Sequence, residues 1–198
     1  MRSLEYQRTI IAYHGCDESV VRHALLTGEP LADSENDYDW LGTGIYFWEF
    51  GPERALEWAA EVKKRNPRRI RRPAVLGAVI NLGHCFDLLD THCTSALSAC
   101  WELYQRRAAV LPENSGPFHR LDCAVINFGL PILETESSSS YHTVRGVFQE
   151  GQPAFTGSDI RKKSHIQICV RDSAAILGYF KPLLISSHAK NHPPATHP

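Results

Sequence analysis

The stretch from residue 39 to residue 62, DWLGTGIYFWEFGPERALEWAAEV, constrains the fold more than any other part of the 198-residue chain. Two glycines precede a short apolar run, Ile45 to Trp48, and a helical pattern follows at once. The side chains of a strand alternate between its two faces. Ile45 and Phe47 are therefore expected to enter a core, whereas Tyr46 and Trp48 face the other way. That second face needs a cover, which is either another part of the protein or a flat ligand.

Length and composition indicate one globular domain. Hydrophobic residues make up 43% of the chain, which separates it from disordered proteins, and 198 residues suffice for one sizeable core. We predict a single domain over residues 1–185 and a disordered tail, rich in His and Pro, over residues 186–198. No apolar run is long enough to cross a bilayer, and no signal peptide is evident. The expected location is the cytoplasm, with no membrane partner.

Short strands alternate with helices early in the chain and with loops late in it. Strands are expected over residues 9–14, 44–48, 74–81, 144–148 and 165–170. Helices are expected over residues 20–26, from Pro52 to about residue 66, over 87–108 and over 121–128. A mixture of this kind favours an α+β fold.

The six cysteines contain no C-x-x-C pair. His84-Cys85 and His92-Cys93 fit no usual zinc-ligand spacing, so we expect no metal. Cys93 and Cys100 lie seven residues apart on an expected helix, and they are therefore expected to share its buried face.

Positive charge is concentrated in two runs although the net charge is only -1. Residues 63–72 read KKRNPRRIRR and residues 161–163 read RKK, and together these runs hold ten of the 21 basic residues. Clusters of this density bind phosphate-rich partners, but they also occur as solvated helix ends and loops. Both interpretations stay open at this point.

Two motifs in a fixed order carry a resemblance to a known family. Tyr13-His14-Gly15 ends the first expected strand, and Gly42-x-Gly44-Ile45-Tyr46-Phe47 forms the second, with a helix after it. Together they resemble the ADP-ribosyltransferase fold, in the branch named for a His, a Tyr and a Glu, which includes diphtheria toxin and the poly-ADP-ribose polymerases. Cys16 stands where that branch has Ser or Thr. The chain is also similar to bacterial proteins that share the run W-L-G-x-G-I-Y-F-W-E. The resemblance covers the first 60 residues well and residues 144–178 loosely.

The resemblance implies a split central β-sheet flanked by helices, with NAD as co-substrate. It implies that the backbone of Gly15 holds the nicotinamide amide, since a residue without a side chain allows close approach. It further implies that His14 bonds a ribose hydroxyl and that the nicotinamide ring stacks on Tyr46. Gly44 belongs to the same cofactor-binding strand. Trp58 lies near where the family places a second ring, and packing into the helix core is its alternative role.

The third motif departs from the family pattern. The family has a Glu at the start of a late strand, and alignment on HIQICV puts Gln167 there. Cleavage of the nicotinamide bond builds an oxocarbenium-like ribose, which a group gripping the 2′-hydroxyl stabilises. A glutamine can hold that hydroxyl, but it cannot accept a proton. The resemblance therefore implies transfer of single units, with Glu150 or the acceptor itself as the source of a base.

Three function classes follow from these residues. The leading expectation is a mono-ADP-ribosyltransferase acting on RNA, DNA or protein, a compact enzyme of the kind used as a bacterial intracellular toxin or defence effector and held by an antitoxin protein. The second is a non-catalytic NAD- or nucleotide-binding module, and the third is a basic nucleic-acid-binding protein. In the family the loop at residues 151–164 meets the acceptor. Phe155 is expected to stack on a base there, and Arg161, Lys162 and Lys163 to contact phosphates.

Overall fold

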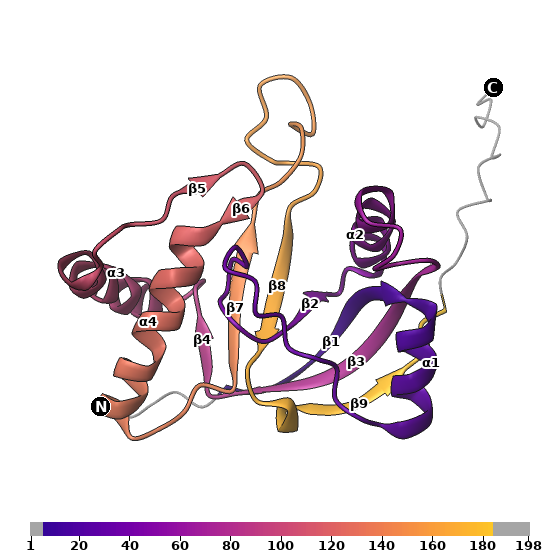
Figure 1. Ribbon diagram of the computed structural model, residues 1–198, viewed down its shortest axis with the longest axis horizontal. Helices are drawn as coiled ribbons and strands as arrows, with labels where there is room; N and C mark the ends of the chain where they lie inside the picture. Colours follow the sequence, from indigo (N-terminus) through magenta and orange to yellow (C-terminus); the bar gives the residue numbers. More distant parts are fainter. Residues whose placement is uncertain (1–5, 184–198) are drawn as a thin grey trace, which may run out of the picture.

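The computed structural model describes residues 6–183, and the tail expected over residues 186–198 lies outside them. Within this range a seven-stranded sheet forms the centre, and four helices pack around it (Figure 1). From one edge of the sheet to the other, its strands are β4 (Cys85–Asp87), β7 (Thr143–Phe148), β8 (His165–Val170), β2 (Ile45–Glu49), β1 (Tyr6–Asp17), β3 (Pro73–Gly83) and β9 (Ile176–Phe180). Neighbours are antiparallel except β4 and β7. This mixed architecture is compatible with the expected α+β class.

The helices lie at both ends of the long axis of the molecule. They are α1 (Glu18–Thr27), α2 (Pro52–Arg65), α3 (Thr91–Arg107) and α4 (Arg120–Ser137), with a 3-10 turn η1 (Ser173–Ala175) before β9. The strands β5 (Asn114–Ser115) and β6 (Phe118–His119) form a separate hairpin. Figure 1 places α1 and α2 at one end, and α3 and α4 at the other. Among residues 6–183, no helix is long and apolar enough to cross a membrane.

Local sequence signals mark the starts of two helices, α1 at Glu18, two residues before the expected span of residues 20–26, and α2 at Pro52, as expected. Asp17 is the N-cap of α1, and its carboxylate accepts a hydrogen bond from the backbone N–H of Ser19 over 3.0 Å. Gly28 ends this helix in the left-handed conformation, with φ 71°. Helix α2 begins at Pro52, whose missing N–H is no loss in a first turn. The strand expected over residues 165–170 is confirmed with those bounds.

The helix expected over residues 87–108 begins later than predicted, at Thr91. The residues up to Asp87 pair in parallel with β7 as the short strand β4. The backbone N–H of Leu88 still bonds across to β7, and Asp90 then caps the helix. Leu88 and Leu89, between β4 and α3, continue the apolar pattern of the helix. The sequence pattern therefore does not distinguish the short strand from the helix.

Helix α4 is longer than the expected span of residues 121–128 and runs to Ser137. Gly129 and Pro131 usually stop a helix, and here they lie inside it. A side chain on Gly129 would put its Cβ 2.5 Å from Sγ of Cys100 on α3. The glycine therefore serves the close packing of α3 on α4, and that tertiary contact outweighs its low helix propensity.

The α1 face of the sheet carries the main core. Ile10 and Ala12 of β1 meet Ile45 and Phe47 of β2 and Ile168 of β8 on this face. Phe47 is 0% exposed, so the inward direction predicted for this ring is confirmed. Helix α1 lies on the same side and adds a smaller apolar cluster through its own buried residues. The rings that strand β2 sends the other way therefore need a separate cover.

The α2 face carries Tyr13, Gly15, Tyr46, Trp48 and Gln167, as strand register and the alternation of side chains require. Trp48 is buried there against α2. Tyr46 is half-buried beside a second apolar cluster, to which α3 and α4 contribute. Other segments of the chain thus cover Trp48 fully and Tyr46 in part.

A buried ion network crosses the α1 face. Arg145 of β7 donates from Nε to Glu49 of β2 over 2.7 Å and from Nη1 to Asp87 of β4 over 3.0 Å. All three side chains are nearly inaccessible to solvent. Arg8 reaches Glu49 from the surface at 3.5 Å. The two carboxylates hold the pKa of the Arg145 guanidinium above its usual range, against the effect of burial.

All six cysteines are free and buried. Cys93 and Cys100 share the buried side of α3, as the sequence predicts. Across the described residues, no group of three or more His, Cys, Asp or Glu side chains is placed to hold a metal ion. The cysteines therefore act as small apolar core residues.

Candidate functional site

The sheet opens between β1 and β2, and the two sequence motifs meet at this opening. The strands form only two registered pairs, the last of which joins Tyr13 to Trp48. Strand β1 continues to pair with β3 on its other side. The antiparallel register of β1 and β2, if continued, would place Gly15 opposite Tyr46. The opening therefore begins at the residues that the motifs single out.

His14 bridges the opening with its side chain. Its Nδ1 lies 2.8 Å from the backbone oxygen of Tyr46. A carbonyl oxygen only accepts hydrogen bonds, so Nδ1 carries the proton and Nε2 is left as an acceptor. Burial lowers the pKa of His14, and the nearby charge of Arg69 lowers it further. The imidazole is therefore neutral at pH 7.

The backbone of Gly15 faces the opening. The oxygen of Ile11 accepts a bond from the N–H of Phe50 on the β2 side, and alternate residues of a strand direct their polar groups to the same side. The N–H and C=O of Gly15 point that way too, beyond the last described β1–β2 pair. A Cβ on Gly15 would collide with the backbone oxygen of Ala55. The glycine thus also lets α2 approach β1 closely.

Tyr46 is anchored by its hydroxyl. The hydroxyl donates to the oxygen of Gly42 over 2.6 Å and accepts from the N–H of Leu41 over 2.9 Å. Burial raises the pKa of the phenol well above its usual value. Gly44 has φ 151°, and a Cβ there would come 2.5 Å from the oxygen of Val170. The glycine motif therefore holds the tyrosine ring in one orientation.

Trp58 packs beside Trp48, with ring centroids 5.7 Å apart. It is half-buried, and the guanidinium of Arg69 lies 5.8 Å from its ring centroid. The charge of Arg69 also contributes to the lowered pKa of His14. The basic run containing Arg69 is visible in the sequence, but its approach to His14 is not.

Gln167 lies on the α2 face directly opposite Trp48. Its side-chain amide nitrogen is 3.1 Å from Nε2 of His165. Nδ1 of His165 lies 2.7 Å from the oxygen of Lys163 and therefore donates, so Nε2 accepts from Gln167. Burial lowers the pKa of His165. The neutral imidazole next to Gln167 is a candidate base that the sequence reasoning missed, although the spacing of two along a strand puts both residues on one face.

Glu150 is not free. It forms an ion pair with Arg54 of α2, and the Arg54 side chain is largely buried whereas that of Glu150 is half-buried. Its backbone oxygen accepts from the N–H of Lys163 over 3.0 Å. Lys163 connects Glu150 to His165, because Nδ1 of His165 bonds the backbone oxygen of Lys163. The carboxylate therefore lies near the third-motif position, but it is already neutralised by an arginine.

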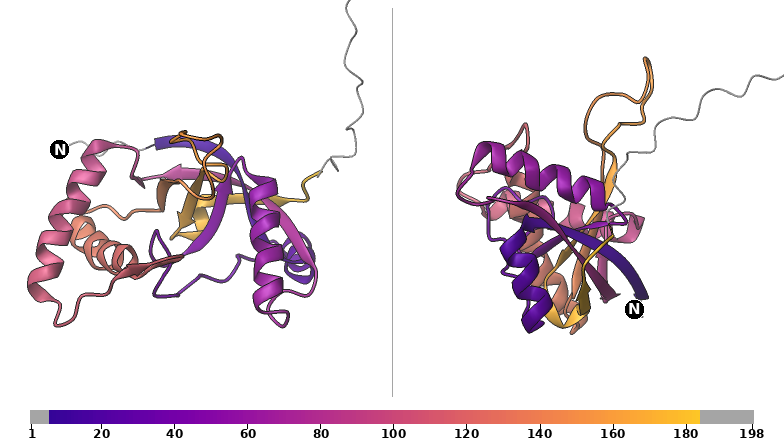
Figure 2. Two further views of the ribbon diagram at one scale, coloured as in Figure 1. Left: turned by 90° about the horizontal axis from the view of Figure 1, so that it is seen from above. Right: turned by 90° about the vertical axis from the view of Figure 1, so that its right-hand side faces the viewer.

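The loop between β7 and β8, residues 149–164, stands out from the sheet (Figure 1 and Figure 2). Its two arms pair through backbone bonds such as Ala154 N–H to the oxygen of Ile160 over 2.8 Å. Phe155 is 67% exposed on it, and Lys162 is exposed as well. Arg161 is half-buried and forms an isolated bridge with the opposite arm.

Lys163 differs from its neighbours because two acidic residues of α2 bind it. Its Nζ lies 2.9 Å from Glu61 and 3.6 Å from Glu57. The hydrogen bond to Glu61 raises the pKa of the lysine. The charge of Lys163 thus ties the base of the loop to α2, whereas the charge of Lys162 faces solvent.

Unsatisfied donors surround the third-motif position. Within residues 6–183, the buried side-chain donors without a hydrogen-bond acceptor are Nε1 of Trp40, Nε1 of Trp48, and Nε and Nη1 of Arg54. Trp48 faces His165 at 6.4 Å between ring centroids, and Trp40 reaches the same region through Phe148. These donors are closed to solvent, so the region is polar but tightly packed.

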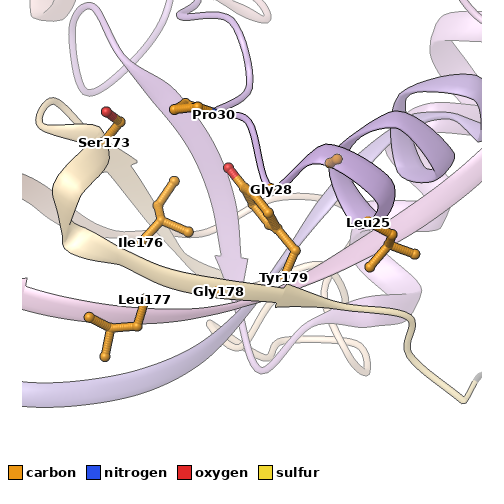
Figure 3. A pocket seen from close by; sticks show the side chains of 9 residues that line it. Leu25, Gly28, Pro30, Ser173, Ile176, Leu177, Gly178 and Tyr179 are labelled. Carbon is orange, nitrogen blue, oxygen red and sulfur yellow. The ribbon is translucent and has the colours of Figure 1, made fainter.

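Two surface hollows lie outside this opening. The first, between α1 and β9 at the sheet edge, is lined mainly by apolar residues such as Leu25 and Ile176 (Figure 3). Tyr179 also lines it, and its hydroxyl accepts from the N–H of Leu31 over 3.3 Å. The second lies over the start of α1 and has a volume of about 470 Å³. Arginines dominate its lining.

Comparison with known proteins adds no assignment. A scan against protein-family models finds no match, and a search of curated proteins finds no match either. The function is therefore inferred from the opening between β1 and β2, from the residues that line it, and from the two motifs that meet there.

Proposed function

We propose that the chain is an ADP-ribosyltransferase that moves one ADP-ribose unit from NAD to a macromolecular acceptor. The observation that carries this proposal is the opening of the sheet at Gly15 and Tyr46, bridged by the neutral imidazole of His14. The N–H and C=O of the glycine, which face this opening, match the acceptor and donor of the nicotinamide amide. The resemblance of the two motifs implies a split sheet, and the end of pairing between β1 and β2 supports that part of the proposal.

Recognition of NAD would draw on groups around the opening. Nε2 of His14 accepts a hydrogen bond from a ribose hydroxyl, and the exposed part of the Tyr46 ring offers a surface for nicotinamide. In this proposal Gly44 and the hydroxyl bonds of Tyr46 act indirectly, because they orient the ring.

The chemistry assigned to the α2 face is a substitution at C1′ of the ribose. The bond from C1′ to the nicotinamide nitrogen breaks, and nicotinamide leaves with the electron pair. Gln167 steadies the developing oxocarbenium charge through the 2′-hydroxyl. When its amide turns from His165 to that hydroxyl, Nε2 of His165 becomes free to take the proton of the attacking acceptor group. His165 suits this role better than Glu150, which is paired with Arg54.

The test is incubation with NAD labelled in its adenylate half. Nicotinamide release is measured, and label is counted separately in RNA, DNA and protein fractions. Release of nicotinamide together with label in one macromolecular fraction supports transfer. Gly178→Ala is the control variant and should behave like the parent protein, since a Cβ there meets nothing within 4 Å. If the parent protein neither binds NAD nor releases nicotinamide, the proposal is refuted.

A non-catalytic NAD-binding module is the second candidate. The pairing of Glu150 with Arg54 favours it, because that pairing leaves the third-motif position without a free carboxylate. NAD binding measured by calorimetry, without nicotinamide release in the presence of RNA, DNA and protein extracts, would decide for this alternative.

A further inference from the structure

The turn between α2 and β3, residues 66–72, displays arginines from a fixed backbone. We call these residues the arginine turn. Ile70, in its middle, is 3% exposed and packs into a core cluster with Ala59 and Val62 of α2. Oδ1 of Asn66 accepts from the N–H groups of Arg68 and Arg69 over 3.2 and 3.3 Å. The arginines therefore project from an anchored segment.

Asp17 attaches the other end of the arginine turn to α1. Its Oδ2 accepts from the N–H of Arg71 over 2.7 Å and from the N–H of Arg72 over 2.8 Å. Its Oδ1 accepts from the N–H and hydroxyl of Ser19. These bonds, led by the one from Arg72, hold the pKa of Asp17 below its usual range. One carboxylate thus fixes the turn against the start of α1.

The result is a hollow with an excess of positive charge. Five arginines line it together with two carboxylates, those of Asp17 and Glu18, so three positive charges are in excess; the arginines are Arg22, Arg68, Arg69, Arg71 and Arg72. Arg72 pairs with Glu18 at 3.1 Å. Within the described residues the side chains of Arg22, Arg68 and Arg71 form no ion pair. Like charges held this close repel one another unless an anion joins them.

We propose that this hollow binds the phosphates of a single-stranded nucleic acid. A guanidinium group donates two parallel hydrogen bonds to two oxygens of one phosphate, which favours phosphate over a monatomic anion such as chloride. Three excess charges exceed what one pyrophosphate needs, so a chain of phosphodiesters fits the hollow better than NAD does. Arg69 connects the hollow to the opening of the sheet, because it lies over Trp58 and its charge reaches His14. In this proposal, a strand bound here extends past Trp58 toward the site assigned to ADP-ribose transfer.

As an acceptor site, this hollow rests on the proposed transferase function, whereas binding itself does not. The experiment therefore measures binding without NAD. A fluorescent 20-nucleotide single-stranded RNA is titrated by anisotropy at several salt concentrations, with single-stranded DNA of equal length as a second probe. The variant is Arg68→Ala with Arg71→Ala, two exposed side chains whose backbone bonds to Asn66 and Asp17 remain. The control is Arg106→Ala with Arg107→Ala on α3, at the other end of the molecule (Figure 1).

The parent protein is expected to bind at least one of the two probes. The Arg68 and Arg71 variant is expected to lose roughly tenfold in affinity, and its salt slope should flatten by about 1.4, since each phosphate contact on a single strand contributes about 0.7. The control variant should retain the parent values. Unchanged affinity and slope would overturn the proposal, as would equal binding of an acidic peptide of the same charge. NAD affinity of the variant is measured separately by calorimetry, and a loss of NAD binding with full RNA binding would assign the hollow to the cofactor pyrophosphate instead. Failure of nicotinamide release would refute the transferase and leave this binding result intact.

Discussion

His14 donates from Nδ1 to the backbone oxygen of Tyr46 over 2.8 Å, at the point where β1 and β2 cease to pair. In a continued antiparallel ladder, that oxygen would accept from the N–H of Gly15. The imidazole thus takes the place of a ladder bond. This bond satisfies the backbone oxygen of Tyr46 on the β2 side. The N–H of Gly15 is therefore not needed as its donor.

The pH dependence of stability should reflect the burial of His14. Its pKa in the fold is lowered, whereas an unfolded histidine titrates near 6.5. Its contribution is therefore present above about pH 6.5 and is lost as the pH falls toward the folded pKa, by at most about 1.4 kcal/mol per pH unit. His14→Asn retains a donor for the Tyr46 oxygen but does not titrate. Urea unfolding at pH 7.5 and pH 5 should show a smaller fall in unfolding free energy for this variant. An identical fall in both proteins would contradict the assignment.

Replacing His165 should separate transfer from NAD binding. His165→Asn removes the proposed base, so transfer should drop on the order of 100-fold, while NAD affinity measured by calorimetry stays within about twofold. The acidic limb of the pH–rate profile should disappear, because a protonated imidazole accepts no proton. Glu150→Gln is the comparison, and it should matter less. If Glu150→Gln loses more transfer activity than His165→Asn, and the pH–rate profile of His165→Asn keeps its acidic limb, the base is the carboxylate of Glu150.

Gly15→Ala should destabilise the protein by about 1–3 kcal/mol, as overpacking of a tight contact does. The new methyl group would collide with the backbone oxygen of Ala55, so α2 must move away from β1. The same substitution at Gly178 meets nothing within 4 Å and should be nearly neutral. Thermal unfolding of the two variants measures the difference. Equal midpoints would show that α2 yields without cost.

Arg145→Met should cost roughly 3–5 kcal/mol of unfolding free energy, because it leaves Glu49 and Asp87 buried without a cation. Arg8→Ala is the matched control. That side chain is 53% exposed and reaches the same Glu49 at 3.5 Å, so its loss should change stability by at most about 1 kcal/mol. Denaturant titration gives both values, and similar small effects would mean that water solvates the two carboxylates.

Part of the fold follows from short-range patterns. Pro52 predicts the start of α2, and alternation predicts the inward side chains Ile45 and Phe47. These predictions hold because capping and alternation depend only on nearby residues. The three-residue strand β4 escapes prediction, since it exists only through pairing with β7, more than fifty residues further along the chain. Gly129 led to a predicted helix end that is too early, because the contact that keeps this glycine inside α4 is with Cys100 on another helix.

In the candidate site, too, some features follow from the sequence and others depend on tertiary contacts. The sequence by itself predicted the motif residues His14, Gly15 and Tyr46, and its resemblance to the family assigned Gln167 to the third motif. Only the tertiary structure decided that Arg54 neutralises Glu150, that two acidic residues of α2 hold Lys163, and that His165 bonds Gln167. The physical reason is range. A residue type and its spacing specify what a side chain can donate or accept, but the partner that satisfies it comes from whichever strand or helix the packing of the core brings within about 3 Å.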